Sequence, residues 1–229
     1  MKQSDRITIN PGTASKVLGC LLAMFLVSLL SCGITGVPAG DIIEKINNGE
    51  HVYYKDVAIR GDLDFTSVSG NGNVVNTEVT FIDCTFKGNV TAKNTVFKKN
   101  VIFTDSTIKA AHGTLGGERR GDVNFSGAQF TGTATFAGMK FNYAVFRSKF
   151  LSGVSFKNAQ FQSYADFYGA QFTNYVDFEG TTFLNGVGFE NATLNGKPFL
   201  EACKRSSLNG VLPKALFVMS TGQFLLNFH

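Results

Sequence analysis

Large apolar residues recur every five or six positions between residues 79 and 195, and a small or β-branched residue usually stands two positions before each of them. From Phe156 onward the steps alternate between five and six, whereas between 136 and 161 we take every step as five and count Leu151 as a large residue. An α-helix repeats apolar residues every 3.6 positions and a strand every two, so neither fits. A chain that turns a corner every five or six residues does fit, with two inward side chains on each short face.

This pattern predicts a continuous ladder of buried large side chains. We expect the ladder to contain Phe81, Phe86, Phe97, Phe103, Phe125, Phe130, Phe136, Phe141, Phe146, Phe156, Phe161, Phe167, Phe172, Phe178, Phe183, Phe189 and Leu194. The composition agrees, because the chain has 23 Phe and no Trp, and Phe can stack in a core without a hydrogen-bond partner. At Lys149 a charge replaces the usual small residue, so we expect Lys149 to point outward and either Phe150 or Leu151 to point inward.

The repeated blocks resemble the pentapeptide-repeat family, whose unit is a small residue, Asp or Asn, a central Phe or Leu, and two further residues. The best matches are Ala165-Asp-Phe-Tyr-Gly169, Val176-Asp-Phe-Glu-Gly180 and Val123-Asn-Phe-Ser-Gly127. The resemblance implies an all-β fold, a right-handed quadrilateral β-helix with four faces per coil. By that analogy a coil takes about 20–22 residues, and coils stack at about 4.8 Å, so residues 79–195 make about five to six coils.

The chain around the repeat divides into further segments. We expect a tether and N-terminal cap over 33–56, the β-helix over 57–197 and a C-terminal cap over 198–229. The cap helix is predicted from Asp41, as its N-cap, to Asn48, and it would cover the open strand edges of the first coil. Residues 67–76 are predicted as a loop and 198–207 as a short helix. The last segment could instead bind a partner, and by resemblance to the family it could pair two copies of the chain.

Residues 1–32 read as an export segment. Lys2, Arg6 and Lys16 precede an apolar run over 17–30, which is short for a membrane span and fits the hydrophobic region of a signal. The run ends at Cys32 in a sequence like a lipobox, which predicts lipidation of Cys32 and attachment to a membrane surface. A cleaved signal, an uncleaved anchor and a buried core helix are the alternatives.

Residues 109–121 interrupt the repeat, although Phe103 and Phe125 stay two eleven-residue units apart. We predict a projecting loop with Arg119 and Arg120 at its tip. It is either a solvated loop or a contact site for an anionic partner such as a lipid headgroup or a polysaccharide.

Residues that could carry out chemistry are scattered along the chain. The four cysteines and three histidines show no metal-binding spacing and no nucleophile pattern, so we predict no catalytic residue, metal or cofactor. Cys84 is expected to fill a small core position. Asp166 and Asp177 each precede a Phe, and we expect them to point outward into solvent, stacked coil over coil.

Three classes of function follow. The first is a non-enzymatic, exported, membrane-associated scaffold or interaction module with an unknown protein or cell-surface partner. The second is mimicry of DNA towards gyrase, which some members of the resembled family perform with an acidic rod. Removal of residues 1–31 takes away three basic groups and one acidic group and leaves 18 Lys and Arg against 16 Asp and Glu, a net charge of +2, which disfavours mimicry and nucleic-acid binding. The third, a groove enzyme, lacks a carboxylate cluster.

Overall fold

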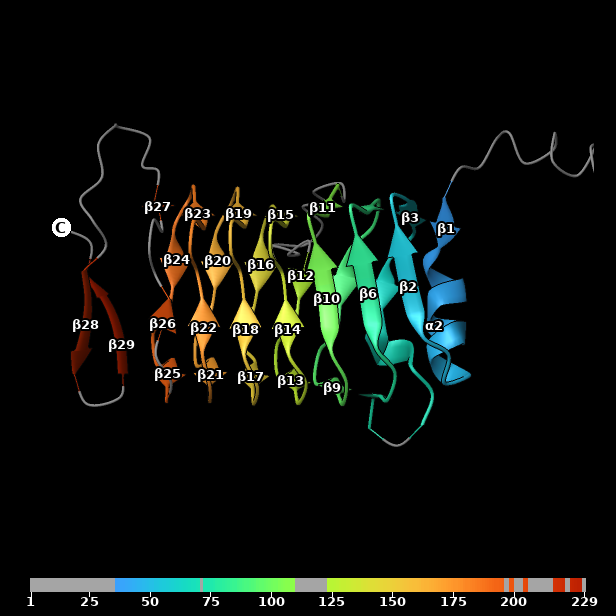
Figure 1. The fold of residues 1–229 in the computed structure, drawn as a ribbon, viewed down its shortest axis with the longest axis horizontal. Helices are drawn as coiled ribbons and strands as arrows, with labels where there is room; N and C mark the ends of the chain where they lie inside the picture. The colour runs from blue at the N-terminus through green and yellow to red at the C-terminus, as the bar shows by residue number, and fades with distance from the viewer. Residues whose placement is uncertain are drawn as a thin grey trace, which may run out of the picture. The chain divides into compact units, whose positions relative to one another are not determined.

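Four parallel sheets surround one core in the unit from Val37 onward (Figure 1). The structure, a computed structural model, describes residues 36–70, 72–109 and 123–195, together with the backbone of four later strands. We name the sheets A to D, and each coil of the chain visits them in the order B, A, C and D. The architecture is a quadrilateral β-helix, as the family resemblance implied, and the single described α-helix lies at its N-terminal end.

Sheets B and A form two adjoining sides of the column. Sheet B contains β2 (Val52–Lys55), β6 (Val79–Ile82), β10 (Val101–Thr104), β14 (Ala134–Thr135), β18 (Val154–Ser155), β22 (Val176–Asp177) and β26 (Pro198–Phe199). Sheet A contains β1 (Val37–Pro38), β3 (Ala58–Arg60), β7 (Thr85–Phe86), β11 (Thr107–Ile108), β15 (Lys140–Phe141), β19 (Gln160–Phe161), β23 (Thr182–Phe183) and β27 (Lys204–Arg205).

Sheets C and D form the other two sides. Sheet C contains β4 (Leu63–Asp64), β8 (Val90–Thr91), β12 (Val123–Asn124), β16 (Ala144–Val145), β20 (Ala165–Asp166) and β24 (Val187–Gly188). Sheet D contains β5 (Val74–Val75), β9 (Val96–Phe97), β13 (Gln129–Phe130), β17 (Lys149–Phe150), β21 (Gln171–Phe172), β25 (Thr193–Leu194), β28 (Leu216–Ser220) and β29 (Gln223–Asn227). A short 3₁₀ helix, η1 (Phe65–Ser67), follows β4. Strand β5 lies inside the stretch predicted as a loop, so that prediction was wrong at Val74 and Val75.

The strand register shows how long each coil is. In sheet B, Val79 pairs with Val101 and Val154 pairs with Val176, so one coil runs over 79–100 and another, equally long, over 154–175. Ala134 pairs with Val154, so the coil over 134–153 is two positions shorter. Outside the shorter coil over 134–153, corners of two kinds alternate. One is a six-residue step, and the other is a five-residue step in which the second residue after the inward one has a left-handed backbone. Those left-handed residues are Asp83, Asn94, Asp105, Gly127, Gly138, Asn158, Gly169, Gly180 and Asn191. Asn, Asp and Gly tolerate that conformation best, which explains the polar residues at these corners.

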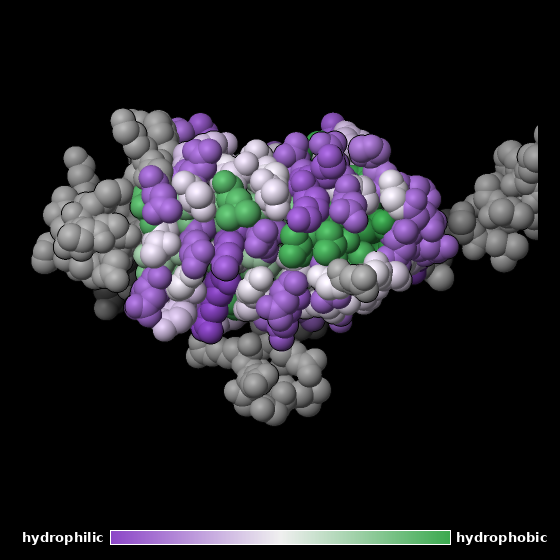
Figure 2. Space-filling model, turned by 90° about the horizontal axis from the view of Figure 1, so that it is seen from below, coloured by the Kyte–Doolittle hydropathy of each residue, from purple (hydrophilic) through white to green (hydrophobic). Residues whose placement is uncertain are grey.

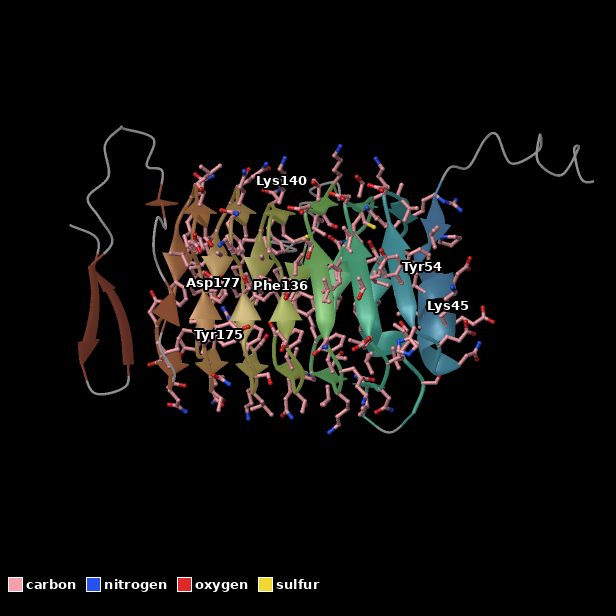
Figure 3. The ribbon with its side chains drawn as sticks, viewed as in Figure 1. Lys45, Tyr54, Phe136, Lys140, Tyr175 and Asp177 are labelled. Atoms are coloured by element: carbon pink, nitrogen blue, oxygen red, sulfur yellow. The ribbon has the colours of Figure 1, made fainter. Side chains whose placement is uncertain are left out.

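The interior is a set of phenylalanine stacks, one along each sheet. In sheet D the rings of Phe130 and Phe150 lie 4.9 Å apart and nearly parallel, and Phe150 stacks on Phe172 at 5.3 Å. In sheet B, Phe136 stacks on Phe156 at 5.3 Å, and Phe136 can be seen within the column in Figure 3. Every residue of the expected ladder is buried. Leu151 is 40% exposed and Phe150 is buried, so our count of Leu151 as a ladder residue was wrong.

Helix α2 (Ala39–Asn47) covers the N-terminal end of the column. It begins two residues earlier than predicted, and Asp41 lies in its first turn while Pro38 is the N-cap, without a side-chain hydrogen bond. Ile42 and Ile46 are buried against the first coil, where they shield strand edges that would otherwise expose unpaired backbone groups. The left-handed Gly49 follows the helix and ends it.

The interruption after β11 is an insertion at one corner. Val101 pairs with Ala134, so this coil runs from residue 101 to residue 133 and is half as long again as the coil over 79–100. Val123 pairs with Val90 in sheet C, whereas Phe103 belongs to sheet B, so Phe125 lies two sheets further round the column from Phe103 rather than directly over it. The extra residues leave and rejoin the column between sheets A and C. The loop itself, with Arg119 and Arg120, lies outside the described residues.

The coil continues beyond its predicted end. Strands β26 and β27 extend sheets B and A, so the short helix expected over 198–207 is not what the structure has there. Strands β28 and β29 form an antiparallel hairpin, and Thr193 of β25 pairs with Gln223 of β29. Among the described residues no helix is long and apolar enough to cross a membrane.

Candidate functional site

The exterior of the column, rather than its interior, carries the polar groups that could bind a ligand. No set of three or more His, Cys, Asp or Glu side chains is placed to hold a metal ion within residues 36–70, 72–109 and 123–195. Cys84 is buried at a small core position, and burial raises the pKa of its thiol. Cys32, the predicted lipidation site, lies outside the described part of the chain.

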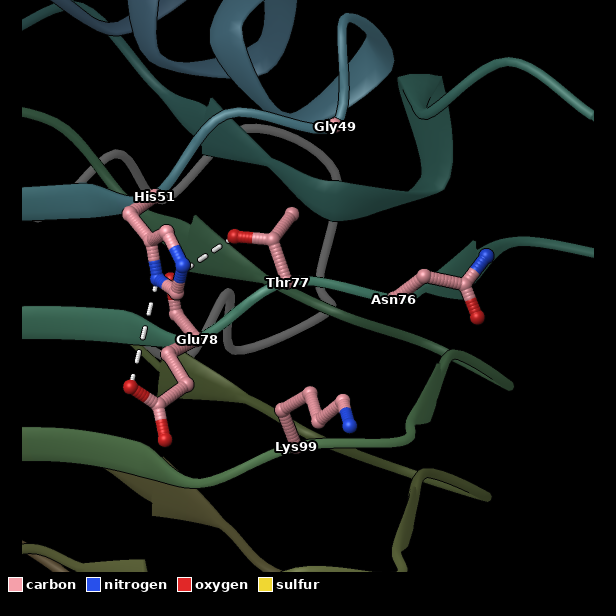
Figure 4. Close-up of a pocket in the computed structure, with 6 residues that line it drawn as sticks. All are labelled: Gly49, His51, Asn76, Thr77, Glu78 and Lys99. Atoms are coloured by element: carbon pink, nitrogen blue, oxygen red, sulfur yellow. Dashed lines mark hydrogen bonds and ion pairs between the residues drawn. The ribbon is translucent and has the colours of Figure 1, made fainter.

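One open cavity lies beside the end of helix α2, at the corner where sheet D turns into sheet B (Figure 4). It has a volume of about 340 Å³ and is lined by Gly49, His51, Asn76, Thr77, Glu78 and Lys99. The His51 Nδ1 lies 3.9 Å from a carboxylate oxygen of Glu78, and both side chains are exposed. Thr77 donates from Oγ1 to the backbone oxygen of Glu50 at 2.7 Å, which fixes the cavity floor. The cavity is large enough for a small polar molecule, but its mouth is open to water.

A more rigid polar cluster lies on sheet C. Asp166 is 4% exposed and accepts two hydrogen bonds from Arg147, at 2.8 Å from Nε and 2.5 Å from a terminal nitrogen. Its other oxygen accepts the backbone N–H of Tyr168 at 2.9 Å, and the guanidinium of Arg147 lies 5.5 Å from the centroid of the Tyr168 ring. The hydrogen bond with Asp166 raises the pKa of Arg147. The cluster ties two successive coils together.

The expectation for the two aspartates was wrong in two respects. Asp166 is buried rather than solvated, because Arg147 neutralises its charge. Asp177 lies in sheet B and pairs with Ser155 and Phe199, so the two aspartates face different sides and do not stack on each other. The sequence did carry a signal for the ion pair: Arg147 stands 19 positions before Asp166, close to one coil length.

Two tyrosine side chains lie over glycine residues and occupy the space that a side chain at those glycines would need. The ring of Tyr164 stacks on Tyr143 at 6.3 Å, and its hydroxyl occupies the place that a Cβ on Gly188 would need. Burial raises the pKa of Tyr164, and the nearby carboxylate of Glu190 raises it further. Tyr175 covers Gly153 in the same way at the corner between sheets D and B. These contacts fix aromatic side chains on an otherwise polar exterior.

The side formed by sheet D is mostly hydrophilic, with a hydrophobic group near the N-terminal coils (Figure 2). Val74 and Val96 are the outward residues of β5 and β9, and both are only half-buried. Lys98 and Lys99 follow β9, and Lys149 begins β17. Sequence periodicity predicted the inward residues of these strands but gave no way to group the outward ones before the register was known.

Comparison with protein families gives one match in the middle of the column. Residues 141–182 match the model described as pentapeptide repeats, nine copies. The matched segment runs from β15 to β23 and includes the Arg147–Asp166 cluster. Among curated proteins no match is found.

Proposed function

This chain is a pentapeptide-repeat protein, and we propose that it serves as a non-enzymatic scaffold or interaction module that is exported and held at a membrane surface. The observation that carries the proposal is the filled interior. Phenylalanine rings from successive coils stack about 5 Å apart along the described column and leave the outer side chains as the part that a partner can meet.

A stacked column is well suited to this task. Each coil is held by its neighbours through backbone ladders and ring stacks, so its outer residues keep fixed spacings of about 4.8 Å along each side. Such a surface needs little ordering when it binds, and preorganisation of that kind raises affinity. The polar cavity at His51 and Glu78 and the cluster at Arg147 are the places where this surface offers directed hydrogen bonds.

Export and anchoring are supported by residues 1–32. The basic start, the apolar run and Cys32 together are the arrangement of a signal with a lipidation site. A single lipid-anchored end would place the column on a membrane surface rather than across it. The near-neutral charge of the remaining chain, +2, argues against mimicry of DNA.

Mass spectrometry of the protein isolated from membranes tests the proposal. We expect an N-terminus that begins at Cys32 and carries an acyl mass, and we expect Cys32→Ser to release the protein from the membrane fraction. Cys84→Ser is the matched control, because a buried thiol in the column should not affect anchoring. An intact Met1 on a protein that fractionates with the cytosol would refute export, and inhibition of DNA supercoiling by that protein would favour the mimic instead.

A further inference from the structure

Sheet B, whose strands lie at the front of Figure 1, has a charge-free region in its middle. Two rows of outward side chains run along this sheet, and the strand register and backbone hydrogen bonds keep them in line from coil to coil. In β6, β10 and β14 and just after β14, every outward side chain is uncharged and half-buried. These residues, which we call the neutral face, are Thr80, Ile82, Ile102, Thr104, Thr135 and Ala137.

The other three sides of the column carry lysine in the same coils. Lys87 and Lys109 directly follow β7 and β11 of sheet A. Lys93 lies two residues after β8 of sheet C, and Lys98 directly follows β9 of sheet D. All four side chains are exposed. Because charged residues are depleted at the centre of protein interfaces, the neutral face is the side of the column that is best suited to burial against another protein.

Charged side chains border the neutral face. Lys55 is the exposed last residue of β2 at its N-terminal end. At the other end Asp177 belongs to β22, and Glu179, two residues later, binds Lys157 at 2.7 Å. The corner with sheet A is acidic in three coils and uncharged in the next three, with Asp56, Asp83 and Asp105 followed by Gly138, Asn158 and Gly180. The two ends of this border therefore differ in charge.

We propose that the neutral face is a dimer interface, on which a second copy of this chain packs its own neutral face with the column running in the opposite direction. A two-fold axis along the strands, between β10 and β14, sets β6 opposite β18 of the second copy and β2 opposite β22. Lys55 then faces Glu179 of the second copy, and Lys157 lies beside its Asp83. Aligned sheets pack about 10 Å apart, within reach of such side chains. The inference goes beyond the proposed function by naming one partner, and it uses a different surface from the C-terminal segment.

The charges select this direction. If the two columns ran in the same direction, the axis would lie along the middle of the face. Lys55 would then meet His51 of the second copy, and Asp83 would come beside its Glu78, so like charges would be neighbours. An antiparallel pair with the axis on β10 would set Lys55 against Lys157. Among these arrangements, the axis between β10 and β14 is the one that pairs both lysines with carboxylates.

The same arrangement gives the open cavity at His51 and Glu78 an occupant (Figure 4). Gly153 of the second copy would lie opposite Glu78, and the ring of Tyr175, which is 46% exposed, covers Gly153. The tyrosine of one copy therefore reaches the cavity of the other, where the Glu78 carboxylate can accept a hydrogen bond from its hydroxyl. A large aromatic side chain set against a hollow is typical of the residues that contribute most to an interface.

The area of the face sets the expected strength of the dimer. Six strands from β2 to β22, about 4.8 Å apart, and about five residues of 3.3 Å along each define a region of about 30 Å by 17 Å on each copy. Two copies would bury about 1,000 Å², which is near the lower limit for a specific interface. We therefore expect a reversible dimer with a dissociation constant in the micromolar range.

Sedimentation equilibrium of the full chain in a density-matched detergent measures this dimer. Thr135→Lys should weaken dimerisation about 30-fold or more, because it places two unpaired charges beside the two-fold axis. Lys140 and Lys149 already occupy outward strand positions, so the variant should fold and keep its melting temperature. Thr85→Lys is the matched control, because Thr85 is an equally half-buried outward threonine in β7 of sheet A, and it should leave the dimer unchanged.

Charge exchange tests the direction of packing. Lys55→Glu and Glu179→Lys should each weaken self-association about 3- to 10-fold, because each reverses two exposed ion pairs across the interface. A mixture of the two variants should form a mixed dimer about as stable as that of the unaltered chain, since every changed charge then faces its opposite. Lys55→Glu with undiminished self-association would overturn the antiparallel arrangement.

Three further results would refute the dimer interface. They are equal losses in Thr135→Lys and Thr85→Lys, a chain that stays monomeric up to about 100 μM, and a dimer that Thr135→Lys leaves intact, which would indicate pairing through the C-terminal segment. The apolar run over 17–30 is present in every variant, so any association through it contributes equally. None of these results bears on membrane anchoring, which the acyl mass at Cys32 tests separately.

Discussion

The side chain of Asn158 fills the space that a side chain on Gly180 would need. Its Oδ1 overlaps the ideal Cβ position of Gly180, which is the corresponding corner residue one coil later. Both residues have left-handed backbones. The same relation joins Asn94 to Gly127, so an Asx residue in one coil selects glycine in the next. Corners are therefore coupled along the column as well as within a coil.

Gly180→Ala should lower the free energy of unfolding by about 3 kcal/mol. A left-handed alanine costs about 1–2 kcal/mol, and the overlap with Asn158 adds to it. Gly169→Ala is the control, because Gly169 is also left-handed but has nothing within 4 Å of its ideal Cβ. In an Asn158→Gly background the two alanine substitutions should cost the same by chemical denaturation. A persistent difference would show that the overlap is not the cause.

Phe167→Ala should destabilise the column by about 3–5 kcal/mol, since it removes a fully buried ring that stacks on Phe146 and Phe189. Tyr168→Ala, at the neighbouring position, should cost about 1 kcal/mol or less because Tyr168 is 47% exposed and contributes mainly its contact with Arg147. Thermal melting of the two variants checks this. Similar losses of stability would mean that the inward and outward assignments are wrong.

Asp166→Asn should cost about 1–2 kcal/mol more than Asp177→Asn. Both aspartates accept a backbone N–H two residues later, at 2.9 Å and 2.8 Å, and asparagine preserves that bond. Only Asp166 is buried against a guanidinium, that of Arg147. Because the Arg147 side chain is half exposed to water, this ion pair is weaker than a fully buried one. A double-mutant cycle of Asp166→Asn with Arg147→Met should isolate the coupling. A coupling energy near zero would contradict the role given to the pair.

Stability should fall more steeply above pH 9 in the unaltered chain than in Cys84→Ala. Burial raises the thiol pKa above its usual 9.0, so the folded state holds this proton more tightly than the unfolded chain does. The contribution is fully present below pH 9 and is lost as the pH rises through the folded pKa. Melting temperatures between pH 8 and 10.5 measure the effect, and Tyr164→Phe separates the tyrosine whose pKa is also raised. Parallel curves for the unaltered chain and Cys84→Ala would refute this assignment.

Sequence periodicity predicted the inward ladder because inward residues report their own burial, and the family resemblance supplied the fold class. Periodicity failed where two neighbouring residues, Phe150 and Leu151, could each be the inward one. The chain reaches strand β17 of sheet D only four residues after Phe146, so Phe150 turns inward and Leu151 does not. The helix start was misplaced because Asp41 resembles an N-cap, whereas the helix starts at Ala39, which is buried, with Pro38 as its N-cap.

Outward residues were harder to predict because their neighbours are one coil away in the sequence. Arg147 reaches Asp166 because the register places Asp166 opposite Val145, two positions before Arg147, and local pattern does not give that register. The cavity at His51 and Glu78 likewise joins the residue before β2 to the residue before β6, one full coil later, because Val52 pairs with Val79. Periodicity therefore predicts which side chains point outward, while the coil lengths decide which of them meet.

The regular register also makes length a modular property of this protein. Removal of residues 154–175 would leave Ala134 below Val176, in the register that Ala134 now has with Val154. Loss of a few residues would instead turn phenylalanines towards water throughout the following segment. Viable descendants of such a gene should therefore grow or shrink by whole turns, and a longer version would offer the same binding motif more often rather than a new one.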